Sequence, residues 1–143
     1  MKFYATILLL SVVLSVAAQD GYEIKITLKP FKNEFVYLGY YYGRQYRVID
    51  SVLLNEKSEG VFKGQKKLGG GTYFITYPDH TIFFNLLIDS NQTFSITADT
   101  MQHRHIVFHS SPENTLYAAY LDSINRINLH LQALEKAFES KDL

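Results

Sequence analysis

The chain has no cysteine, no tryptophan and only three prolines among its 143 residues. Without cysteine it forms no disulfide bond and carries no thiol redox chemistry of its own, so packing alone must stabilise its fold. It also lacks an excess of charge, since 14 basic and 14 acidic residues balance. Binding to nucleic acid or to an anionic membrane surface needs a basic excess, so we expect no nucleic-acid partner.

The first 18 residues predict a signal peptide. Lys2 supplies a positive charge, residues 5–14 form an apolar run, and residues 16–18 (VAA) form a small-residue cleavage site. The apolar run is shorter than the roughly 20 residues that a membrane-spanning helix needs. We therefore expect cleavage near Ala18, an exported periplasmic chain of about 125 residues, and no stable membrane anchor after cleavage.

Residues 19–110 predict a β domain. Short segments rich in β-branched and aromatic residues alternate with turns that contain Gly, Pro, Asn or Asp. The expected strands are residues 22–29, 34–42, 46–54, 61–64, 72–77, 81–88, 93–98 and 105–109, and the sixth and seventh are expected to form a hairpin across residues 89–92. This spacing predicts a mainly β fold, either an antiparallel β-sandwich or an open barrel of seven or eight strands.

Residues 111–143 predict one long amphipathic helix. Ser111 is the expected N-cap and Pro112 the first helical residue. Apolar residues then recur at alternating intervals of three and four, the 3.5-residue repeat of a helix that packs along another helix. This apolar stripe, which we call the seam, consists of Tyr117, Tyr120, Ile124, Ile127, Leu131, Leu134 and Phe138.

Two ways of covering the seam remain open at this point. The helix could lay its apolar side on the sheet of its own domain, or it could pack on a protein partner or on a second copy in a homodimer. The seam is roughly 32 Å long at 1.5 Å per residue, which exceeds the width of a small sheet. The part near Tyr117 and Leu121 could dock on the β domain while the part from Ile127 to Phe138 projects beyond it.

Three histidines are candidate metal ligands, because His103, His105 and His109 would project from one face of a continuous strand. The same alternation directs Ile106 and Phe108 to the core and leaves the histidines in solvent. The Cα atoms of His105 and His109 would lie about 13 Å apart, too far for one ion. We therefore expect no metal site and no cofactor.

A tyrosine cluster between residues 37 and 46 is a candidate ligand surface. Strand alternation places Tyr40 and Tyr42 on one face and Tyr37 and Tyr41 on the other. An exposed pair, Tyr40 with Tyr42, could stack on a sugar or a peptide. Aromatic residues are also common in strands for structural reasons, and tryptophan, the strongest stacking residue, is absent.

Patterns typical of catalysis are missing from the sequence. Three glycines at residues 69–71 follow two lysines, but a strand comes next, whereas a phosphate-binding loop opens a helix. No serine lies in a nucleophile-elbow pattern, and carboxylates such as Asp50 and Asp89 are scattered through turns and strand ends. We therefore expect a turn at residues 69–71 and a chain that is not an enzyme.

Several short motifs together resemble one known family. They are residues 37–43 (YLGYYYG), 48–51 (VIDS), 62–64 (FKG), 68–73 (LGGGTY), 84–89 (FNLLID), 94–96 (FSI) and 110–114 (SSPEN). The chain resembles the N-terminal domain of unknown function that precedes thioredoxin-like domains in exported thiol-disulfide oxidoreductases of Bacteroidetes-type bacteria. In that family the redox chemistry belongs to a later domain with a Cys-x-x-Cys pair, and no position here matches a catalytic residue.

The resemblance implies a non-catalytic accessory module of a periplasmic thioredoxin-like system, which docks or dimerises through its C-terminal helix. The alternative is a stand-alone glycan- or peptide-binding module that uses Tyr40 and Tyr42. The same bacterial group O-glycosylates exported proteins at Asp-Ser or Asp-Thr followed by an apolar residue or Thr. Ser51, Thr100 and Ser123 fit that pattern.

Overall fold

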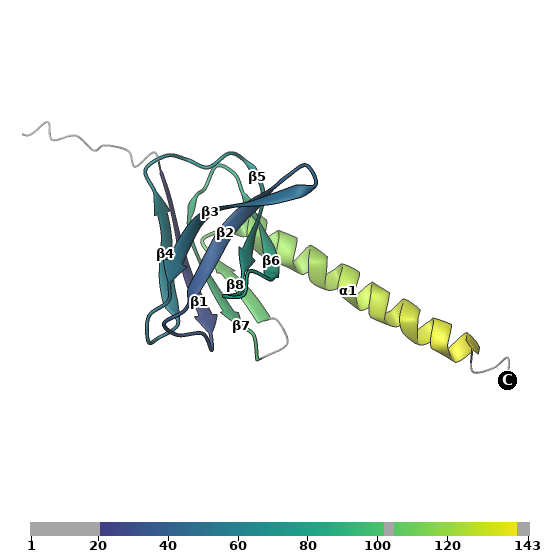
Figure 1. Ribbon diagram of the computed structural model, residues 1–143. Coiled ribbons are helices and arrows are strands. Elements are labelled where there is room, and N and C mark those ends of the chain that lie inside the picture. Colours follow the sequence, from purple (N-terminus) through teal and green to yellow (C-terminus); the bar gives the residue numbers. More distant parts are fainter. Residues whose placement is uncertain (1–20, 102–104, 140–143) are drawn as a thin grey trace, which may run out of the picture.

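Residues 21–101 and 105–139 are described in a computed structural model and form eight strands followed by one helix (Figure 1). The elements are β1 (Tyr22–Lys29), β2 (Phe35–Tyr42), β3 (Gln45–Leu53), β4 (Glu59–Gly64), β5 (Gly71–Thr76), β6 (Ile82–Ile88), β7 (Thr93–Asp99), β8 (His105–His109) and α1 (Pro112–Glu139). The predicted mainly β fold with one C-terminal helix is confirmed, and each strand boundary lies within two residues of its prediction. The predicted signal peptide lies outside the described residues.

The strands form two four-stranded sheets. Sheet A has the order β4-β1-β7-β8, and sheet B has the order β3-β2-β5-β6. Every pair is antiparallel except β1 with β7, whose register matches Ile24 with Phe94 and Ile26 with Ile96. The described strands therefore form a sandwich of two separate sheets and no closed barrel.

The predicted hairpin between the sixth and seventh strands is wrong. β6 pairs with β5 in sheet B, whereas β7 pairs with β1 and β8 in sheet A. The polar residues 89–92 cross from one sheet to the other. Gln92 holds this crossing in place, because its buried amide accepts a hydrogen bond from Leu68 N and donates to Leu68 O and Asp89 O.

One continuous core fills the space between the sheets. On β1 the side chains of Ile24, Ile26 and Leu28 are fully buried, and the residues between them point outward, as strand alternation requires. Val36 and Leu38 of β2 face them from the other sheet. Core side chains of this kind give the sandwich its stability without disulfides.

Candidate interaction surface

The helix α1 is fixed to the sandwich at its first turn. α1 contacts β6 and β8, which are the edge strands of the two sheets on the same side of the sandwich. Ser111 is buried, and its carbonyl oxygen accepts a hydrogen bond from Thr115 N at 3.0 Å. This confirms Ser111 as the N-cap and Pro112 as the first helical residue.

Asn114 makes the central contact of this junction. Its side chain is fully buried, and its Oδ1 accepts a hydrogen bond from Leu87 N at 2.6 Å. Its Nδ2 donates to Leu87 O at 2.8 Å and to Ser111 Oγ at 2.8 Å. The amide thus satisfies both backbone groups of an edge-strand residue, as a neighbouring strand would.

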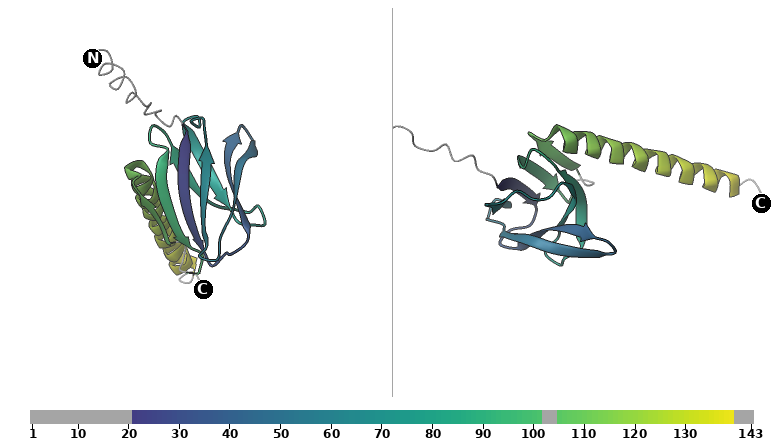
Figure 2. Two further views of the ribbon diagram at one scale, coloured as in Figure 1. Left: turned by 90° about the vertical axis from the view of Figure 1, so that its left-hand side faces the viewer. Right: turned by 90° about the horizontal axis from the view of Figure 1, so that it is seen from above.

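Beyond this junction α1 leaves the sandwich. Tyr117 and Ala118 are half-buried, and most side chains from Ala119 to Phe138 are exposed. Figure 1 and the right view in Figure 2 show the helix extending away from both sheets. The 28 residues of α1 span about 42 Å, and Asn114 and Ala118, which contact the sandwich, both lie in its first two turns.

The seam lies along this projecting part. Six of its seven side chains are between 40% and 71% exposed: Tyr120, Ile124, Ile127, Leu131, Leu134 and Phe138. Tyr117, the first residue of the seam, is half-buried. Of the two ways of covering the seam, packing on the chain's own sheet is therefore not seen along these six residues.

Charge is arranged away from the seam. Asp122 and Arg126 form an ion pair across one helical turn, with 3.7 Å between Arg126 Nε and Asp122 Oδ2, and both are well exposed. None of the described helical segments combines the length and the apolarity that crossing a membrane requires.

The candidate ligand surface at Tyr40 and Tyr42 differs from the prediction. Tyr40 packs against the core, with its ring centroid 5.9 Å from that of Tyr73, so its predicted exposure is wrong. Tyr42 has the same parity but lies near the tip of the β2–β3 hairpin, where it is exposed and Arg47 stacks on it at 5.1 Å. The two tyrosines do not form one exposed pair.

The outer face of sheet B carries a different aromatic cluster, centred on Phe74. Its ring is fully buried although it lies outside the core, because Tyr41 and Tyr46 cover it edge-on at 5.2 Å and 5.8 Å. Gly39 leaves room for this ring, since a Cβ there would lie 2.3 Å from Phe74 Cζ. Tyr41 Oη also donates to Asn85 Oδ1. These aromatic groups are occupied in packing.

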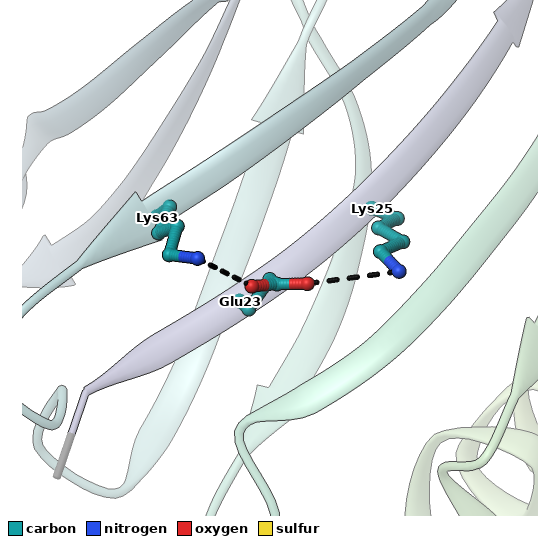
Figure 3. Close-up of polar contacts among 3 residues, drawn as sticks. All are labelled: Glu23, Lys25 and Lys63. Carbon is teal, nitrogen blue, oxygen red and sulfur yellow. Dashed lines mark hydrogen bonds and ion pairs between the residues drawn. The ribbon is translucent and has the colours of Figure 1, made fainter. Parts of the chain in front are cut away.

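The outer face of sheet A carries a small cluster of charged residues from β1 and β4 (Figure 3). Glu23 lies between two lysines, with 2.7 Å from Glu23 Oε2 to Lys63 Nζ and 3.6 Å from Glu23 Oε1 to Lys25 Nζ. The hydrogen bond from Lys63 is the main cause that lowers the pKa of the Glu23 carboxyl. Exposed pairs of this kind contribute little to stability, so this face is a solvated surface.

Of the candidate metal ligands, His103 lies outside the described residues, and His109 is exposed at the end of β8. Within residues 21–101 and 105–139, no three metal-binding side chains gather at one point.

Residues 69–71 lead directly into β5 as predicted, and Tyr73 Oη donates to Gly69 O. Of the candidate glycosylation residues, Ser51 is exposed, whereas Thr100 and Ser123 are partly exposed.

Asn114 and Gln92 are the two position-setting residues that the sequence analysis missed. Each is a buried amide that pairs with both backbone groups of one distant residue. For Asn114 the sequence did contain a signal, because an amide stands in the first turn of an amphipathic helix on the side that is expected to be buried.

No family model, curated protein or solved structure matches the chain.

Proposed function

We propose that the protein is a non-catalytic, exported interaction module that contacts another protein chain through the seam of α1. The observation that carries this proposal is the exposed apolar stripe on a helix whose first turn is rigidly fixed. An isolated helix gains little stability from its own hydrogen bonds in water, so a long projecting helix with an apolar stripe is typical of an element that packs on a partner.

The exposed area is large enough to matter energetically. Each of the six exposed seam side chains offers about 100 Å² of apolar surface. At about 25 cal/mol per Å², covering all six yields a gross gain of roughly 15 kcal/mol, before the cost of losing translational and side-chain freedom. A surplus of about 8 kcal/mol, roughly half of this total, corresponds to a micromolar dissociation constant.

The proposal places this module beside a thioredoxin-like partner domain that carries the redox chemistry. Its support is the set of strand and turn motifs between residues 37 and 114, together with the absence of cysteine. The intact mass of the natural protein in its own exported fraction tests this part. A mass larger by a domain would show the partner in the same chain, whereas a mass near that of the chain without residues 1–18 requires a separate partner.

The interaction itself is tested by a matched pair of substitutions on α1. Ile127 lies in the seam and is 56% exposed, whereas Leu129 lies on the opposite side of the helix and is 58% exposed. Ile127→Asp and Leu129→Asp therefore add the same charge in place of equally exposed apolar side chains.

Size-exclusion chromatography of the native exported fraction is the assay. We expect the wild-type chain and Leu129→Asp to elute in a complex, and Ile127→Asp to elute at the mass of the single chain. Elution of the wild-type chain at its single-chain mass would contradict the proposal.

A further inference from the structure

We propose that the chain which covers the seam is a second copy of this protein, so that two α1 helices pack along each other. This inference rests on the proposed function, because it names the partner of the same surface. Three properties of α1 lead to it: the charges beside the seam, the area that the seam offers, and the regularity of its spacing.

The positions that flank the seam favour a pair of identical helices. In a two-helix packing the residues beside the apolar stripe approach those of the partner, and charged residues there select partners of opposite charge. Between residues 116 and 137 the flanking residues are Leu116, Leu121, Ser123, Asn128, His130, Glu135 and Ala137. Glu135 is the one acidic residue among them, and none is Lys or Arg.

Identical helices bring like charges together, so a charged flank would oppose self-pairing and an uncharged flank permits it. Between residues 116 and 137, the charges other than Glu135 lie away from the flanks. Asp122 and Arg126 pair with each other within one helix, on positions that a seam-to-seam contact leaves in solvent. With Glu135 as their one acidic residue and no Lys or Arg, the flanks between residues 116 and 137 form no row of like charges that would repel a second copy.

The area also fits a pair. Six side chains at about 100 Å² each give roughly 600 Å² per helix, and two copies therefore bury about 1,200 Å², the lower bound of stable protein interfaces. A second copy matches this stripe in length and in its three-four spacing, which is the condition for side chains of one helix to fill the gaps of the other. The stripe is accessible to a second copy, because its six side chains from Tyr120 to Phe138 are exposed.

Sedimentation equilibrium of the purified chain between roughly 1 and 100 µM tests the inference. We expect the mass of two copies for the wild-type chain and for Leu129→Asp. Ile127→Asp should weaken the pairing at least about 100-fold, because it buries two uncompensated carboxylates at the centre of the contact. Leu131→Asp is a second seam variant, and circular dichroism of each variant verifies that the sandwich remains folded.

Each result decides between the two proposals. A wild-type chain that stays monomeric up to 100 µM in sedimentation overturns the pairing of copies. If chromatography of the native fraction nevertheless shows a complex that Ile127→Asp abolishes, the proposed function stands and the partner is a different protein. A monomer in both preparations overturns both. Equal weakening by Ile127→Asp and Leu129→Asp would show unspecific apolar association and overturn the pairing, as would a mass of three or more copies.

Discussion

Asn114→Ala is the substitution that most directly probes how α1 is fixed to the sandwich. The change removes the three hydrogen bonds that the fully buried Asn114 side chain makes with Leu87 N, Leu87 O and Ser111 Oγ. At about 1 kcal/mol for each bond, the expected loss in the free energy of unfolding is about 3 kcal/mol. The backbone groups of Leu87 would also lose the partner that covers the edge of β6.

Urea unfolding followed by far-ultraviolet circular dichroism measures this loss, since the chain has no tryptophan for fluorescence. With a slope of about 2 kcal/mol per M, the midpoint should fall by roughly 1.5 M. Asn125→Ala is the control, because Asn125 is exposed on the same helix and its replacement should change the stability by less than about 0.5 kcal/mol. If Asn114→Ala were as stable as this control, the buried amide would not be what fixes the helix.

Two further predictions concern the sandwich. Gly39→Ala should destabilise the protein by about 2 kcal/mol in the same urea assay, because the new Cβ would lie 2.3 Å from Phe74 Cζ. Gly69→Ala is the control: its new Cβ would meet nothing within 4 Å, so it should change the stability by less than about 0.5 kcal/mol. Equal effects of the two substitutions would contradict the packing described for Phe74. Burial, reinforced by the hydrogen bond to Asp50, raises the pKa of the Tyr22 phenol above its ordinary value of 10.0. The protonated phenol therefore contributes fully to the free energy of unfolding below pH 10, and this contribution is lost as the pH rises further. Tyr22→Phe should therefore lose less stability than the wild-type chain between neutral pH and strongly alkaline pH, and parallel alkaline profiles in thermal unfolding would refute this.

The sequence predicts the strands well because their signal is local. In β1 each apolar residue between Tyr22 and Leu28 alternates with a polar one, and that alternation alone determines which side is buried. The N-cap at Ser111 is equally local. Such features depend on a few neighbouring residues and need no knowledge of the rest of the fold.

The features that sequence analysis missed depend on distant segments. Residues 89–92 resemble a hairpin turn, and only the pairing of β7 with β1 shows that they cross between the sheets. The shared parity of Tyr40 and Tyr42 was correct, but aromatic residues occupy both faces of β2, so alternation could not decide which face meets the core. Gly39 was the available clue, because a glycine within a strand leaves space for a side chain such as Phe74.

The exposed seam follows from sequence and structure together. The three-four repeat was visible from residue 117 onward, but its exposure depends on where α1 leaves the sandwich, and this is determined by the contact of Asn114 with β6. One local pattern and one long-range contact therefore create the surface on which the proposed function rests.

Amide hydrogen exchange along residues 121–138 tests most directly whether a second copy covers the seam. Most side chains there are exposed and the helix extends away from the sandwich, so its amides should exchange rapidly in dilute solution and more slowly as the concentration rises toward about 100 µM. In Ile127→Asp the exchange should remain rapid at every concentration. Exchange in the wild-type chain that is equally rapid at all concentrations would contradict the account.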